Sequence, residues 1–192
     1  RYIFELAMFL KKLGEYKESL KFIDQALEIE PERVIFKIAK ALILSKSGKD
    51  LEACNLIESI DSKKYSSSLL FQTKAEIYSN IGDWEKALDA LTRQHIIHPH
   101  LHYVLALRGN VKISLNDING AKEDFKLAKK IIKKSSQSTF SSIMHGNWKK
   151  DYEQILTDTT MGYIKFGESR ICAIVKDYEK ALEYSEIGYY KF

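Results

Sequence analysis

Four of the chain's five histidines lie within one short segment, at His95, His98, His100 and His102. Imidazole nitrogens bind zinc, copper and nickel, and histidine also changes its charge near neutral pH. A structural zinc site needs ligands fixed in tetrahedral geometry, whereas these residues straddle a predicted helix end and a turn at Pro99. A histidine near a helix C-terminus is also favoured by the helix dipole without any metal. We therefore predict no metal site and no cofactor, and keep a metal- or pH-responsive regulator as the most distant alternative function.

A second group with possible binding chemistry is a run of lysines near the end of a predicted helix. Its ordinary interpretation is a solvated helix face with cations close to the helix C-terminus. The alternative is a docking site for an acidic protein, a phosphate group or nucleic acid. No aromatic residue that could stack on a base lies among them, and the net charge of the chain is only +4, so nucleic acid is not predicted as a partner. The lysines are Lys126, Lys129, Lys130, Lys133 and Lys134.

The motifs of the common catalytic sites are missing. The sequence has no phosphate-binding glycine loop, no Gly-x-Ser-x-Gly turn and no His-Glu-x-x-His pair. Cys54 and Cys172 are the two cysteines, and two isolated cysteines form no disulfide framework and cannot complete a zinc site. We therefore predict that the protein is not an enzyme, has no catalytic residue, and works in the cytoplasm or another reducing intracellular compartment.

Length and composition fit a soluble chain with a sizeable core. The sequence has 192 residues, of which 45% are hydrophobic and 29% charged. Its apolar runs, such as residues 41–44, are far shorter than the ~20 residues of a membrane-spanning helix, so no membrane span is predicted. Because the chain begins at Arg1, already inside an apolar pattern, we expect it to be a fragment of a longer protein.

The elements that position these residues recur at a step of 34 residues. The turn residues Gly14, Gly48, Gly82 and Asn116 are related by this step, and Gly and Asn readily adopt a left-handed backbone after a helix. Small residues at the same step let two helices approach closely, and large apolar residues fill the space between units. One unit cannot bury its apolar face alone, so neighbouring units must stack. The small positions are Ala7, Ala41, Ala75 and Gly109, and Ser19, Ala53, Ala87 and Ala121; the large ones are Ile23, Ile57, Leu91 and Phe125.

Two segments show the pattern most completely. They are LGEYKESLKFIDQALEIEP, from Leu13 to Pro31, and IGDWEKALDAL, from Ile81 to Leu91. Each unit resembles the tetratricopeptide repeat (TPR), with its small residues, its Gly-Asp-Tyr-like turn, its large apolar residues and its final proline. The resemblance implies an all-α fold, a right-handed α-solenoid of helix-turn-helix units. The first four units are predicted at residues 1–33, 34–67, 68–101 and 102–134.

After the fourth unit the repeat is interrupted and then resumes. Residues 135–139 are polar, and an apolar pattern with helical spacing begins at Trp148. The turn and second helix of a unit return at Tyr178. We therefore predict an inserted loop and helix at residues 135–160 and a fifth TPR-like unit at residues 161–192, in one continuous array. The insertion is interpreted as a solvated loop with a capping helix, or alternatively as a segment that folds into the groove or forms a partner surface.

The resemblance also implies where a partner lies, because the first helix of each TPR unit lines the concave side of the array. The residues predicted to face this groove are largely apolar, with amides, one carboxylate and a guanidinium, a mixture that suits a peptide backbone with apolar anchors. We therefore predict a protein-interaction module or scaffold that binds a partner protein or an extended peptide in the groove. The predicted groove residues are Phe4, Met8, Ile35, Ile38, Leu42, Leu69, Gln72, Glu76, Ser79, Tyr103, Ala106, Asn110, Ile113, Tyr163, Phe166 and Arg170.

Two other interpretations stay open at this stage. Apolar residues such as Phe4, Ile38 and Leu42 can instead pack against other helices. The protein can also be a structural subunit of a larger complex that contacts its partners through the convex face or the insertion.

One TPR subfamily holds the C-terminal carboxylate of chaperones with lysine, asparagine and arginine on its inner helices. The matching places in this chain hold Phe4, Met8, Ala39, Leu69 and Thr73. Because a carboxylate needs charge-assisted donors, which these side chains do not provide, we predict no clamp of this kind.

Overall fold

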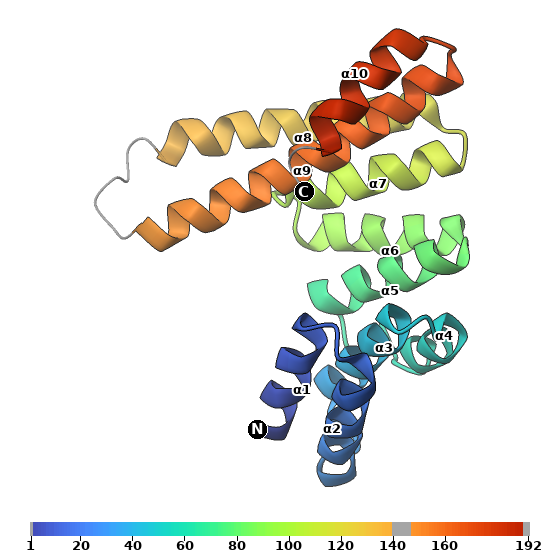
Figure 1. Ribbon diagram of the computed structural model, residues 1–192, viewed down its shortest axis with the longest axis vertical. Helices are drawn as coiled ribbons and strands as arrows, with labels where there is room; N and C mark the ends of the chain where they lie inside the picture. The colour runs from blue at the N-terminus through green and yellow to red at the C-terminus, as the bar shows by residue number, and fades with distance from the viewer. Residues whose placement is uncertain (1, 140–146, 190–192) are drawn as a thin grey trace. The chain divides into compact units, whose positions relative to one another are not determined.

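The part of the chain that the computed structural model describes, residues 2–139 and 147–189, is built of ten helices and contains no strand. Side chains are described for residues 2–135 and 154–185. The helices follow one another in pairs joined by short turns (Figure 1), which confirms the predicted all-α helix-turn-helix fold. In chain order they are α1 (Tyr2–Lys12), α2 (Tyr16–Ile29), α3 (Val34–Lys46), α4 (Asp50–Glu58), α5 (Ser68–Ile81), α6 (Trp84–Ile97), α7 (His102–Ser114), α8 (Ile118–Thr139), α9 (Asn147–Ile174) and α10 (Tyr178–Tyr189).

The chain divides into two compact units. Unit 1 spans Arg1–Ala90 and unit 2 spans Leu91–Phe192, so the boundary lies within α6. In unit 1, α3 contacts α1, α2, α4 and α5; in unit 2, α7 contacts α8 and α9, and α10 packs on α9. The predicted repeat boundaries stay predictions, although each of the first three predicted ranges holds one whole helix pair.

Each helix pair reverses direction at one residue with a left-handed backbone. The next residue then donates its backbone N–H to a carbonyl in the last turn of the first helix, as Asp83 does to Tyr78 at 2.9 Å, which satisfies a carbonyl that the helix leaves open. All four turn residues predicted from the 34-residue step are confirmed, and Lys176 is the fifth. The left-handed residues are Gly14, Gly48 and Gly82, each with φ 80°, Asn116 with φ 63° and Lys176 with φ 64°.

The small residues of the repeat allow close packing within the pairs. Ser19 of α2 and Ala7 of α1 are both fully buried, and the Ser19 hydroxyl donates to the Ala7 carbonyl at 2.7 Å. The last pair has the corresponding contact with the two helices exchanged: the Ser169 hydroxyl of α9, the first helix of that pair, donates to the Ala181 carbonyl of α10 at 2.8 Å. A side chain can reach the backbone of the partner helix in this way only where both positions are small.

The ring of Phe125 takes the place of the smaller aliphatic residue found in the first three units, and two glycines make room for it. Phe125 lies on α8 and is 2% exposed. A Cβ atom on Gly109 of α7 or on Gly167 of α9 would approach this ring more closely than real side chains do. The ring therefore fits between α7 and α9 because both helices lack a side chain there.

The structure corrects the prediction for the segment after the fourth unit. The predicted inserted helix within residues 135–160 is not a separate element, because α8 continues to Thr139 and α9 runs without a break from Asn147 to Ile174. Figure 1 shows the end of α8 and the start of α9 extending past the N-terminal end of α7. Adding a polar residue to an existing helix costs little compared with nucleating a new one, so α8 continues beyond its predicted end. Residues 140–146 lie outside the described part of the chain.

Replacing Gly109 with alanine is expected to lower the free energy of unfolding by about 1–3 kcal/mol, because the new Cβ atom and the Phe125 ring need the same space. Urea denaturation followed by circular dichroism measures the change. The double variant Gly109→Ala/Phe125→Leu gives positions 109 and 125 the residue types that stand 34 residues earlier in the sequence, Ala75 and Leu91. Its loss of stability should be smaller than the sum of the two single losses, and exact additivity would show that glycine and ring do not interact.

Candidate functional site

The first helices of the pairs in unit 1 share one surface, because α3 contacts both α1 and α5. We call their accessible side the inner face of unit 1. All groove residues predicted in this unit except Ile38 are half-buried or exposed. The residues predicted for the inner face of unit 1 that stay accessible are Phe4, Met8, Ile35, Leu42, Leu69, Gln72, Glu76 and Ser79, and Lys11 and Lys46 lie on the same helices.

Some of the predicted groove residues are used for packing. Ile38 is fully buried in the core of unit 1, in one cluster with Leu44 and Ile57, and its side chain is not accessible to a partner. Phe4 is half-buried because its ring stacks on that of Phe36, with 4.7 Å between the ring centroids. The packing interpretation therefore applies wholly to Ile38 and in part to Phe4.

Two charged side chains form an ion pair on this inner face, and a third is close enough to interact with them electrostatically. Lys46 of α3 forms an ion pair with Glu76 of α5, with 2.5 Å between Nζ and Oε1. Lys11 of α1 interacts with both: burial lowers the pKa of the Lys11 ammonium, Glu76 partly offsets this effect, and the positive charge of Lys46 adds to it. The Lys11–Lys46–Glu76 cluster is thus a polar centre with a surplus positive charge inside an apolar surface.

The two lysines of this cluster are not among the predicted groove residues. Lys11 lies three residues after Met8, and Lys46 lies four residues after Leu42, so each continues the helical stripe of a predicted groove residue. Extending each stripe by one helical turn would have found both.

The inner face of unit 2 is formed by α7 and α9, which contact each other. Of the residues predicted to line it, Ala106 and Ile113 are buried in the core of unit 2 together with Leu105 and Ile164. These two side chains stabilise the packing of the helices and are not accessible to a partner. Tyr103 is half-buried, and its hydroxyl accepts a hydrogen bond from the Gln94 amide at 3.0 Å.

The polar groove residues predicted in unit 2 connect α7 to α9. The Asn110 amide donates to the Tyr163 carbonyl at 2.9 Å. The Arg170 guanidinium donates to the Asn110 carbonyl at 3.1 Å and to the Ser114 hydroxyl at 3.0 Å, and burial lowers its pKa. The accessible groups on this face are aromatic: Tyr163 is 36% exposed and Phe166 is 57% exposed.

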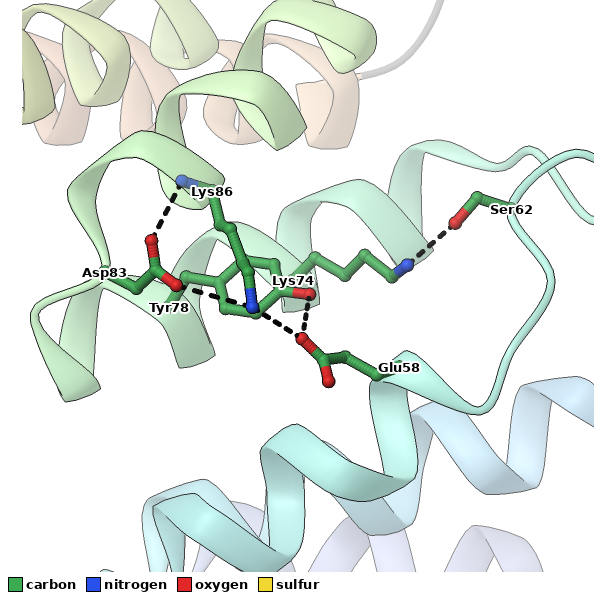
Figure 2. A network of polar contacts seen from close by, with 6 residues as sticks. All are labelled: Glu58, Ser62, Lys74, Tyr78, Asp83 and Lys86. Atoms are coloured by element: carbon green, nitrogen blue, oxygen red, sulfur yellow. Dashed lines mark hydrogen bonds and ion pairs between the residues drawn. The ribbon is translucent and has the colours of Figure 1, made fainter.

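A further polar network joins α4, α5 and α6 in unit 1 (Figure 2). Lys86 Nζ lies 2.8 Å from Glu58 Oε1, and the Tyr78 hydroxyl donates to the same oxygen at 3.3 Å. Burial and the nearby Glu58 carboxylate raise the pKa of Tyr78 to about 12, and the hydrogen bond from Lys86 lowers the pKa of Glu58. A tyrosine with so high a pKa stays protonated at neutral pH, so this network positions helices and is poorly matched to proton transfer.

The histidine segment does not converge on one point. His102 is 9% exposed, and its Nδ1 lies 2.9 Å from the Thr160 hydroxyl. That hydroxyl donates to a backbone carbonyl, so His102 Nδ1 carries the proton of their shared hydrogen bond. His98 and His100 contact each other edge to face, whereas burial and the nearby Arg108 lower the pKa of His95. Within the described residues no group of three or more His, Cys, Asp or Glu side chains is placed to hold a metal ion.

A buried carboxylate with two cations links α7 to α8. Asp124 of α8 is 4% exposed. Arg108 donates to its two oxygens at 2.8 and 2.6 Å, and Lys112 Nζ lies 3.0 Å from Oδ2. Because all three side chains are largely removed from water, each charge depends on the others for compensation.

One sequence family and several solved structures are similar to this chain. The family described as "Psidin, N-terminal TPR repeats region" matches residues 10–106, just over half of the chain. No curated protein sequence matches. None of the described helices is both long and apolar enough to cross a bilayer.

The similar solved structures are MamA proteins. MamA 41-end from Desulfovibrio magneticus RS-1 has 17% identity and a TM-score of 0.63, over 69% of this chain and 75% of that one. The MamA RS-1 ArsTM double mutant has 16% identity, the same TM-score and the same coverage. MamA MSR-1 C2 has 14% identity and a TM-score of 0.63, over 99% of this chain and 94% of that one. At these identities the likeness shows the fold alone, an α-solenoid.

Replacing Asp124 with asparagine is expected to lower the free energy of unfolding by about 3–5 kcal/mol, because Arg108 and Lys112 would remain buried without a counter-charge. The matched control is Asp24→Asn, which removes the carboxylate of the more exposed Lys40–Asp24 pair and should cost about 1 kcal/mol or less. Denaturant titration of both variants gives the comparison. If the two variants lost similar amounts of stability, burial of the charges would not increase the cost of removing the Asp124 carboxylate.

Stability should fall as the pH is lowered from about 7 to 5. Burial lowers the pKa of His102 in the folded chain, whereas the unfolded chain keeps the ordinary value of about 6.5, so the unfolded state binds the proton first. The variant His102→Asn keeps a donor for Thr160 but does not titrate, and should show a weaker pH dependence in thermal melts. His95, whose pKa burial also lowers, accounts for the pH dependence that the variant retains. If the melting temperature changed equally with pH in the variant and the wild type, the role of His102 would be contradicted.

Proposed function

This chain belongs to the TPR family described as the Psidin N-terminal repeats region, and from that premise we propose that it holds a partner protein by an extended segment laid along the inner face of unit 1. TPR chains in general are protein-interaction scaffolds, and a helical-repeat fold of this kind is typical of a non-catalytic module. The extended segment and the inner face are the finer parts of this proposal.

The observation that supports the proposal most directly is the Lys11–Lys46–Glu76 cluster, in which an ion pair joins two consecutive first helices and Lys11 of α1 lies close enough to feel both charges. An extended peptide presents alternating carbonyls, amides and side chains, so it can hydrogen-bond to such a centre while its apolar side chains contact the surroundings. Leu69, which is 41% exposed, and the half-buried Leu42 supply apolar contact. Each methylene group buried there contributes about 0.8 kcal/mol.

The charge of the cluster favours one kind of segment. Two lysines and one glutamate leave a surplus positive charge on the inner face, so a carbonyl-rich or mildly acidic segment is better matched than a basic one. The cluster is partly buried, and its interactions are therefore screened by salt less than those of fully exposed charges.

No comparable observation supports the second helices of unit 1 as the partner-binding surface. Their exposed apolar residues include Ile29 and Leu51, which are 68% and 77% exposed. Single exposed apolar side chains of this kind are common on soluble proteins and need no partner.

Site-specific photo-crosslinking tests the proposal. With p-benzoylphenylalanine at Gln72, on the inner face, irradiation in a lysate is expected to yield a discrete crosslinked partner. With the same residue at Gln25, an exposed position on α2, that band should be absent. Equal crosslinking from both positions would contradict binding at the inner face.

A charge variant supplies the second measurement. Lys46→Glu removes the surplus positive charge of the cluster and should lower the crosslinking yield about tenfold, which corresponds to ~1.4 kcal/mol of binding free energy. Lys63→Glu makes the same charge change at an exposed site of unit 1 and should leave the yield unchanged. Both variants need melting temperatures close to wild type, and Lys11→Glu replaces Lys46→Glu if the latter unfolds.

A further inference from the structure

A pocket of about 420 Å³ lies in unit 2 between α8, α9 and α10. It is formed by side chains of the second helices and of the far side of α9, and none of its lining residues belongs to the inner faces. Its volume is in the range of pockets that take a ligand or the side chains of a peptide.

The floor of the pocket is apolar and one wall is cationic. Phe125 and Ile171, which are 2% and 5% exposed, form the floor. Lys122, Lys126 and Lys129 of α8 line the wall, and their spacing of four and three residues places them on one side of that helix.

The charges around the pocket are unbalanced. Its lining contains one carboxylate, Glu168, which pairs with Lys129 at 2.5 Å and lies 3.5 Å from Lys165. Glu168 is thus already shared by two cations. Lys122 and Lys126 are exposed and form no ion pair with any other described residue, so the rim has positive charge available to an incoming anion.

We propose that this pocket binds an acidic segment of a partner protein, with a carboxylate between Lys122 and Lys126 and a neighbouring apolar side chain on Phe125 and Ile171. The segment supplies both things that the pocket lacks, negative charge at the rim and apolar atoms over the floor. This contact is independent of the inner face of unit 1.

The other anionic ligands fit less well. A nucleic-acid strand needs aromatic faces on which bases can stack, but the ring of Tyr184 in the lining is covered by the Lys165 ammonium 4.2 Å from its centroid. A free phosphate ion would leave the apolar floor of the pocket unfilled. A peptide with both acidic and apolar residues satisfies the whole lining.

Fluorescence anisotropy with the full chain tests the proposal. The probe is a short labelled peptide of repeated Glu-Glu-Leu; Lys-Lys-Leu and Glu-Glu-Ser peptides report on the charge and on the apolar floor. The variant Lys122→Glu/Lys126→Glu should bind the Glu-Glu-Leu peptide at least about tenfold more weakly. The matched control Lys63→Glu/Lys64→Glu makes the same charge change at exposed residues of unit 1 and should change the affinity by about twofold or less.

Cysteine labelling localises the bound peptide. Cys172 lines the pocket, so a saturating Glu-Glu-Leu peptide should slow its alkylation, whereas Cys54 in unit 1 should react at an unchanged rate. Three results would overturn the proposal: equal weakening by the two double variants, no protection of Cys172, or displacement of the peptide by an equal concentration of inorganic phosphate. Neither variant replaces a buried residue, and circular dichroism confirms that each is folded.

Discussion

Each helix pair of this chain depends on one residue that can adopt a positive φ at the end of its first helix. That residue fixes the length of the turn, and the turn determines which sides of the two helices meet. The small residues of the repeat then face each other at the position where Ser19 reaches the Ala7 backbone. A pair built in this way still has an unburied apolar side, which only the next pair can cover. The stacking of pairs therefore follows from the turn.

Unit 2 makes use of two adjacent residues of α8 in different ways. Phe125 fills the space that glycines leave in α7 and α9, while Asp124 anchors α7 through Arg108 and Lys112. Steric fit and charge compensation thus act at neighbouring positions, and both hold α8 against α7. One side of α8 is therefore fixed by packing, and the opposite side can present lysines to solvent.

Much of the fold could be predicted from the sequence because the repeat is encoded locally. A left-handed turn needs glycine or asparagine, and their 34-residue spacing located four of the five turns; the fifth, at Lys176, has a residue that gives no such signal. The continuity of α9 from Asn147 could not be predicted, because a polar segment is compatible with both a loop and a helix. The sequence also placed Ile38 and Ile113 on an accessible surface, whereas both are buried. Periodicity gives the face of a helix but not which neighbours cover it.

The candidate site was harder to predict than the fold because it depends on several helices at once. Glu76 could be assigned to the inner side of its helix from spacing alone. Its contact with Lys46 and its interaction with Lys11 depend on how far α1, α3 and α5 are shifted along one another. That register is set by packing across the pairs, and no local pattern encodes it.

The contact of Phe125 with two glycines has a consequence for how such chains diverge. A larger side chain at position 109 or 167 is tolerated only if Phe125 is replaced by a smaller side chain. A smaller side chain at position 125 in turn leaves a void unless one of the glycines is replaced. Substitutions at the three positions are therefore expected to be correlated. Covariation among homologues should link positions 109, 125 and 167, although they lie on three different helices. Where neighbouring substitutions compensate in this manner, backbones can stay alike after most residue identities are lost, as in the solved structures with 14–17% identity.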